Sequence, residues 1–199
     1  MKKYIPFGLV WLRLALAPVV LCLAYTNPKP QFLLVVCLWA ALISDIFDGI
    51  LARRWGIATE ALRRADSRVD VIFWLSACVS VWWIRPDAVW AHRYGIIALF
   101  CLEPISDAIY MVRFRQDGCA HNWLSKAWGI LLLLALSSVL GWGHTGALFG
   151  VTIVWGLLSQ LDRIAIACLL PAAECDIPSA YHAYLRRQGK TFKRYKLFN

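Results

Sequence analysis

The sequence predicts an all-α, polytopic membrane protein with six transmembrane helices and both termini in the cytoplasm. Hydrophobic residues make up 60% of the 199 residues and charged residues only 17%, below the roughly one quarter that is usual in soluble domains. Several apolar stretches reach the roughly 20 residues that a helix needs to cross a bilayer. We expect one membrane domain over residues 1–171.

The distribution of lysine and arginine predicts the orientation of these helices. Basic residues precede the first apolar stretch, follow the second, lie between the fourth and fifth, and follow the sixth, whereas the alternate loops hold only Lys29, Arg85 and Arg93. Such an excess in every second loop is typical of cytoplasmic loops. The net charge of +9 therefore indicates membrane orientation, and we expect no nucleic acid among the partners.

Proline and charge divide the first half of the chain into three helices. The first is expected over residues 6–25, and it is retained because Arg13 and Pro18 interrupt the pattern of a cleaved signal peptide. The second is expected over residues 31–55, after the prolines of the TNPKP turn. The third is expected to start near Asp66 and to end before the sequence IRPD.

The second half of the chain contains three further helices and a tail. The helices are expected over residues 88–113, 122–142 and 147–170. After Pro171 the composition changes, because residues 172–199 mix aromatic side chains with basic ones. This segment is expected to be a basic cytoplasmic tail, and both a segment lying on the membrane surface and a disordered tail fit its composition.

Four aspartates gather where the second helix ends and the third begins. The first helix face combines two aspartates with two small residues at positions i, i+3, i+4 and i+7, namely Asp45, Asp48, Gly49 and Ala52. The second face has two aspartates at i and i+4, Asp66 and Asp70. Such spacings place side chains on one face of a helix. Because the loop is short, we expect the two helices to be antiparallel neighbours with their aspartates turned toward each other.

This arrangement of carboxylates favours a metal and phosphate site. Four carboxylates in a low-dielectric setting repel one another unless they are protonated or neutralised by cations. Oxygen ligands without His or Cys at the same depth point to a hard ion such as Mg²⁺ or Mn²⁺. Gly49 and Ala52 leave room for a diphosphate, and Arg53 is placed to hold its oxygens. The alternative is a set of surface Asp–Arg pairs, with Asp66 capping its helix.

The pattern from residue 45 to residue 70 closely resembles the signature of the CDP-alcohol phosphatidyltransferases. It reads Asp45-x₂-Asp48-Gly49-x₂-Ala52-Arg53-x₈-Leu62-x₃-Asp66-x₃-Asp70. The six-helix layout agrees with this family, and Arg13 followed five residues later by Pro18 is similar to its N-terminal segment. One position departs from the signature, because the family has a glycine where this chain has Leu62.

The resemblance implies a homodimeric enzyme of the cell membrane that faces the cytoplasm. Such an enzyme transfers a phosphatidyl group from CDP-diacylglycerol to an alcohol and releases CMP. The family pattern implies metal ligands for two Mg²⁺ or Mn²⁺ ions at Asp45, Asp48, Asp66 and Asp70. It also implies that Asp70 is the general base, and that Gly49, Ala52 and Arg53 contact the CDP diphosphate. A two-cation site can stabilise the attacking and leaving oxygens of an in-line displacement.

The acceptor alcohol is less constrained than the donor. Several acceptors in the family are phosphorylated and need basic residues near the metals, and Arg113 and Lys126 lie in a stretch expected on the same side as the aspartates. Glycerol 3-phosphate is the acceptor that we favour, and inositol phosphate is the alternative. Leu62 narrows the nucleotide pocket or shifts the loop, which leaves a non-catalytic relative as another reading.

A function from a different class is a small ion-coupled transporter. Its relay would consist of buried acidic residues spread across the membrane, namely Asp45, Glu103, Asp107 and Asp162. The four signature aspartates instead cluster at the expected cytoplasmic helix ends. Asp162 and Arg163 are expected to form a structural ion pair.

Overall fold

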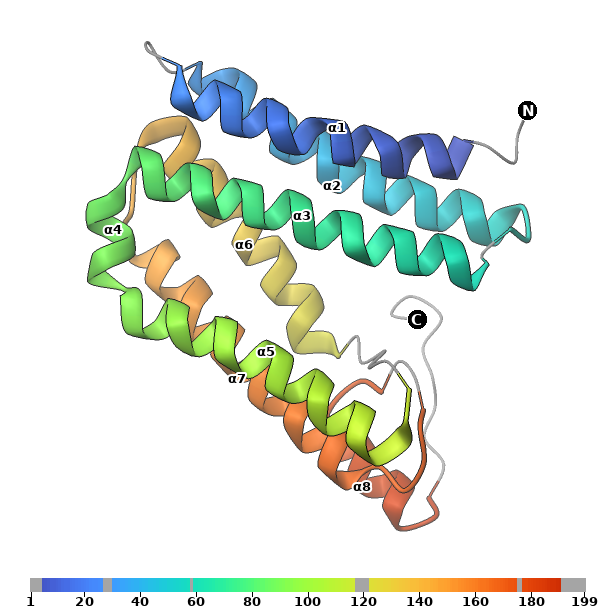
Figure 1. The fold of residues 1–199 in the computed structure, drawn as a ribbon. Helices are drawn as coiled ribbons and strands as arrows, with labels where there is room; N and C mark the ends of the chain where they lie inside the picture. The colour runs from blue at the N-terminus through green and yellow to red at the C-terminus, as the bar shows by residue number, and fades with distance from the viewer. Residues whose placement is uncertain (1–4, 27–29, 58, 117–121, 175–176, 191–199) are drawn as a thin grey trace. The chain divides into compact units, whose positions relative to one another are not determined.

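The computed structural model describes residues 5–26, 30–57, 59–116, 122–174 and 177–190. Over these residues it contains eight helices and no strand (Figure 1), and six of the helices are long and apolar enough to cross a membrane. The prediction of an all-α protein with six candidate spans is confirmed. The cytoplasmic location of the termini stays a prediction.

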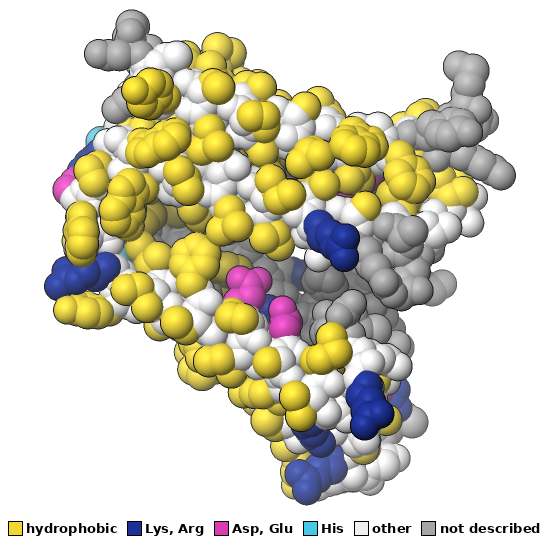
Figure 2. Space-filling view, viewed as in Figure 1, with side chains coloured by type: hydrophobic (Ala, Val, Ile, Leu, Met, Phe, Trp, Pro, Cys, Tyr) yellow, Lys and Arg dark blue, Asp and Glu magenta, His cyan; other side chains and the backbone are white. Residues whose placement is uncertain are grey.

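The chain forms two compact units, residues 1–90 with 133–145 and residues 91–132 with 146–199. Hydrophobic side chains cover most of the face drawn in Figure 2, and many large apolar side chains of the long helices are exposed. Exposed apolar surface on this scale is expected of helices that contact lipid.

The first unit is built around its N-terminal helix. Its long helices are α1 (Ile5–Tyr25), α2 (Gln31–Arg54) and α3 (Glu60–Ile84), followed by the short α4 (Pro86–Ala91). Figure 1 shows the start of α1, the end of α2 and the start of α3 at the same end of this unit. Over the described residues, the extensive helix contacts here are those of α1 with α2 and of α1 with α3. Helices α2 and α3, which we expected to be antiparallel neighbours, are joined by α1, which packs against both.

Helix α3 begins earlier than predicted, at Glu60 and not near Asp66. The Oγ1 atom of Thr59 accepts a hydrogen bond from the backbone N–H of Leu62 at 3.2 Å and caps the helix. The following sequence EALRRA contains only strong helix formers, so the charged stretch continues the helix. Asp66 lies inside α3 and does not cap it.

The second unit contains α5 (Arg93–Phe114), α7 (Ala147–Leu169), α8 (Ala180–Arg187) and the first half of α6 (Trp123–Trp142). Helix α7 packs closely against its neighbours at Gly156, where an added Cβ atom would lie 2.6 Å from Trp128 Nε1 and 2.8 Å from Leu99 Cδ2. The Trp128 indole donates a hydrogen bond to the Thr152 carbonyl at 3.1 Å. Glycine at position 156 therefore allows α5, α6 and α7 to approach one another.

Two sequence expectations change in this unit. The helix predicted over residues 88–113 is divided, because α4 ends at Ala91 and α5 begins at Arg93. Part of the predicted tail is folded, since α8 buries Ala183 against Ile166 and Leu170. Residues 191–199 lie outside the described residues, and a contact of the tail with the membrane surface stays a prediction.

Candidate metal site

The four predicted aspartates meet at one arginine of α1. Arg13 Nη1 donates hydrogen bonds to Asp45 Oδ1 at 2.9 Å and to Asp70 Oδ1. Its Nη2 donates to Asp48 Oδ2 and to Asp66 Oδ1. The arginine is 1% exposed. The aspartates of α2 and α3 therefore converge, and the group on which they meet is the Arg13 guanidinium of α1.

The site predicted from the sequence does not include Arg13. Its position inside an apolar helix was the available signal, because an ionisable residue in a membrane span is expensive and needs a partner. The sequence did not identify that partner, since the pairing depends on α1 packing against both acidic helices.

The carboxylates fit a divalent cation. Asp45, Asp48 and Asp66 each offer one oxygen, and these oxygens lie within 4.8 Å of one another. Asp48 is buried, whereas the side chains of Asp45, Asp66 and Asp70 are 29% to 38% exposed. The four carboxylates share the one guanidinium of Arg13. An all-oxygen donor set of carboxylates suits Mg²⁺ or Mn²⁺.

The residues predicted to hold a diphosphate lie beside this cluster. Ala52 is 6% exposed and belongs to an apolar group with Val10, Leu62 and Val69. Leu62 itself is 5% exposed, so its side chain fills space next to the Ala52 methyl group.

Gly49 is partly exposed on α2, one residue after the buried Asp48. The side chain of Arg53 lies outside the part of the chain that the structure describes. Diphosphate binding by Gly49, Ala52 and Arg53 stays a prediction.

The two predicted acceptor residues belong to the second unit. The Arg113 guanidinium donates hydrogen bonds to the carbonyl of Ala167 and, at 3.2 Å, to that of Leu170. It therefore satisfies carbonyls at the C-terminal end of α7, as basic side chains commonly do. Lys126 is exposed near the start of α6. Their roles toward an acceptor stay predictions.

The other acidic residues of the spans have different partners. Asp162 accepts hydrogen bonds from Asn122 Nδ2 at 2.7 Å and from the backbone N–H of Ala180 at 2.9 Å, at the start of α8. Arg163 donates to Asp107 Oδ1 at 2.7 Å and to Gln160 Oε1 at 3.1 Å. The predicted Asp162–Arg163 pair is therefore wrong, because adjacent residues of a helix point to different neighbours.

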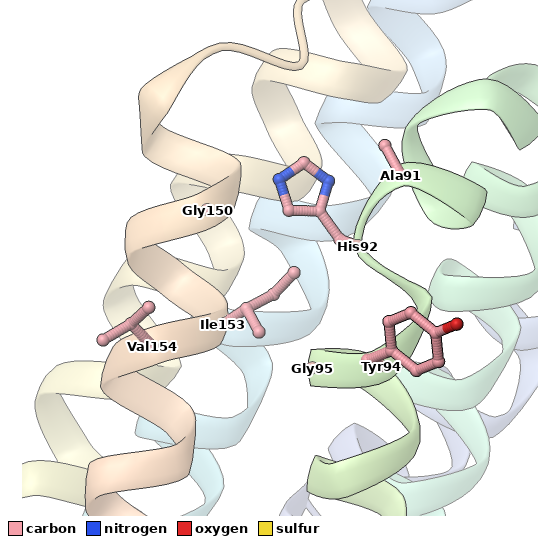
Figure 3. A pocket seen from close by; sticks show the side chains of 7 residues that line it. All are labelled: Ala91, His92, Tyr94, Gly95, Gly150, Ile153 and Val154. Atoms are coloured by element: carbon pink, nitrogen blue, oxygen red, sulfur yellow. The ribbon is translucent and has the colours of Figure 1, made fainter.

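A crevice in the second unit has no acidic residue in its lining. It has a volume of about 250 Å³ and is formed by the start of α5 and the N-terminal half of α7 (Figure 3). His92 and Tyr94 line it together with Gly95, Gly150 and aliphatic side chains. These residues do not form a set of metal ligands or a nucleophile with its base.

The fold and the aspartate cluster define a polytopic membrane protein with an oxygen-donor site suited to a divalent cation and a phosphorylated substrate. The sequence model of the CDP-alcohol phosphatidyltransferase family matches residues 3–167. The chain belongs to this family of phosphotransferases, which act in phospholipid biosynthesis and generally use a divalent metal. Members transfer a phosphatidyl group from a CDP-alcohol to an acceptor. No curated protein and no solved structure matches the chain significantly.

Proposed function

We propose that this chain transfers a phosphatidyl group from CDP-diacylglycerol to glycerol 3-phosphate and releases CMP. The convergence of four carboxylates from α2 and α3 on one point carries this proposal. Family membership supports the reaction class. The basic loops predicted on the same side as the aspartates support a site that faces the cytoplasm.

The aspartates take two roles in this reaction. Asp45, Asp48 and Asp66 would hold Mg²⁺ or Mn²⁺, which supplies positive charge for the diphosphate and for the oxygens of the displacement. Asp70 takes the proton of the acceptor hydroxyl as its oxygen attacks the phosphatidyl phosphorus. The phosphorus–oxygen bond to CMP breaks, and CMP leaves. Asp70 suits this role because its side chain is 31% exposed and is anchored by Arg13.

A lipid donor is supported by an apolar groove in the same unit. The groove lies between α1 and α2 and has a volume of about 510 Å³. Ile5, Leu9 and Leu12 of α1 face Ala40, Ile43 and Phe47 of α2 across it. Phe47 directly precedes Asp48, so the groove runs along the helix that carries half of the cluster. An acyl chain of the donor fits this lining.

A phosphorylated acceptor is supported by basic residues in the last turn of α5 and the first turn of α6. Lys126 is exposed, and Arg113 uses two guanidinium nitrogens on carbonyls of α7. We propose both Arg113 and Lys126 as residues for the acceptor phosphate. Inositol phosphate is the alternative acceptor. We also propose that the enzyme works as a homodimer, as the family resemblance implies.

The test is acceptor-dependent release of CMP. Purified protein in lipid nanodiscs receives CDP-diacylglycerol, Mg²⁺ or Mn²⁺, and each of several alcohols, including glycerol 3-phosphate and inositol phosphate. We expect CMP release with glycerol 3-phosphate, and loss of this release in Asp45→Asn and Asp70→Asn. Release with inositol phosphate alone would replace the acceptor. If no alcohol gives more CMP than the variants do, the transferase proposal fails.

A further inference from the structure

We propose that Arg13 is a built-in counter-ion of the aspartate cluster, and that its guanidinium competes with a divalent cation for the same carboxylates. Arg13 thereby becomes a positioning residue that sets the cation affinity of the site and joins three helices. The proposal concerns cation binding alone, so it does not depend on the acceptor or on turnover.

The hydrogen-bond geometry is the first step of this inference. Each terminal nitrogen of a guanidinium carries two hydrogens, and here each bridges one aspartate of α2 and one of α3. Nη1 joins Asp45 to Asp70, and Nη2 joins Asp48 to Asp66. Oxygens of Asp45, Asp48 and Asp66 lie within 4.8 Å of one another. A cation that contacts these three side chains must therefore bind carboxylates that the guanidinium already holds.

The second step is the way in which the guanidinium is attached. Arg13 Nε is buried and has no hydrogen-bond partner among the described residues. The guanidinium is therefore held through its two terminal nitrogens, and all four of their recorded partners are the carboxylates of the cluster. A cation that takes over Asp45, Asp48 and Asp66 removes three of the four partners that hold Arg13 in place and leaves Asp70.

The third step is electrostatic. Loss of Arg13 removes one positive charge from among four carboxylates, so the potential at the cluster becomes more negative and stronger repulsion among the carboxylates raises the free energy of the folded protein. The same negative potential strengthens the binding of any cation. Loss of Arg13 should therefore tighten divalent cation binding and, at the same time, make folding depend on the cation.

The experiment measures Mn²⁺ binding to the full-length protein in nanodiscs, after chelator treatment, by electron paramagnetic resonance of free Mn²⁺. Arg13→Gln is expected to bind Mn²⁺ roughly tenfold more tightly or better, the scale on which a neighbouring charge changes proton affinity of a carboxylate. Arg13→Lys keeps the positive charge but lacks the planar guanidinium with its two terminal nitrogens. Its affinity for Mn²⁺ should therefore stay nearer to that of the unchanged protein. The matched control is Arg85→Gln, whose guanidinium pairs with Asp87 outside the cluster.

A second pair of variants covers the case in which Arg13→Gln fails to fold. Asp70→Asn removes one carboxylate from the cluster and leaves the three that share the 4.8 Å grouping. Arg13→Gln/Asp70→Asn should then bind Mn²⁺ more tightly than Asp70→Asn alone. Equal or weaker binding in the double variant, with helical content intact by circular dichroism, overturns the proposal. The Mn²⁺ binding measurement contains no substrate, so its result does not depend on whether the protein releases CMP.

Discussion

The two units of this protein each place an arginine and acidic residues inside membrane-length helices, and they do so in different ways. In the first unit, Arg13 is 1% exposed and is shared by four aspartates from two helices. In the second unit, Arg163 is paired with Asp107 at 2.7 Å and lies 4.0 Å from Glu103, both on α5. Those two carboxylates are about half exposed, at 54% and 49%.

This difference distinguishes the aspartate cluster, a candidate metal site, from the structural ion pair at Arg163. Four carboxylates from two helices share Arg13, and such a cluster of like charges is costly in a low-dielectric setting. The α5 carboxylates lie one turn apart on a single helix and are more open, which is the pattern of a pair that joins α5 to α7. Clustering of like charges, burial and convergence from separate elements together indicate cation binding.

The most direct test of this difference compares the activity of Asp48→Asn with that of Asp107→Asn. Asp48 is buried in the cluster, so its amide should lower CMP release by about a thousandfold, at the upper end of what loss of one electrostatic group costs an enzyme. Asp107→Asn should stay close to the unchanged protein. Initial rates at saturating Mg²⁺ give the answer, and comparable losses in both variants would place the second cluster in the machinery.

The stability of the same two regions provides the next test. Arg13→Gln takes its cationic partner from the buried Asp48 and should lower the free energy of unfolding by about 3–5 kcal/mol in the presence of chelator. Arg163→Gln removes a more exposed pair, for which about 1 kcal/mol is the expected loss. Thermal unfolding in nanodiscs measures both. An equal drop in the two variants would show that the aspartate cluster depends no more on its arginine than the Arg163 pair does.

Leu62 tests whether the nucleotide space beside Ala52 is partly filled. Leu62→Gly should lower the KM for CDP-diacylglycerol by roughly tenfold, the effect of relieving one steric group in a binding pocket. Loss of a buried leucine also destabilises the protein. Val10→Ala is the control, because it removes bulk from the same apolar group on α1 and should reduce stability without changing KM. An unchanged KM in Leu62→Gly would remove the steric argument.

The smallest expected effect concerns the start of α3. Thr59→Ala removes the cap whose hydroxyl accepts the Leu62 N–H and should cost about 1 kcal/mol of stability. Asp66 and Asp70 lie further along the helix, so CMP release should change little. Thermal unfolding that matches the unchanged protein would mean that Thr59 does not hold this helix end.

The sequence predicted the acidic half of the site better than its basic half. Helical spacing was enough to place Asp45 with Asp48 and Asp66 with Asp70, because those positions are local to one helix each. Arg13 was out of reach, since its role depends on α1 packing between the acidic helices. The same distinction applies to Asp162 and Arg163, whose partners come from α5, α8 and the residues before α6.

The boundaries of α3 were missed for a different reason. The sequence predicts a start near Asp66, although the residues from Glu60 to Ala65 have high helix propensity and follow a threonine that can cap a helix. These residues are polar and close to the expected membrane surface, and they nevertheless extend α3 by about a turn and a half before Asp66. The sequence therefore predicts which carboxylates belong together better than it predicts tertiary packing and helix ends.

The position of Arg13 has a consequence for the order of membrane assembly. Its partners lie 32 to 57 residues further along the chain, so a ribosome completes α1 before any of them exists. The apolar residues of α1 must therefore offset by themselves the roughly 2.5–3.5 kcal/mol that an arginine at the centre of an inserting helix costs. The cluster forms only when α2 and α3 have followed, which makes closure of the site a late step in biogenesis.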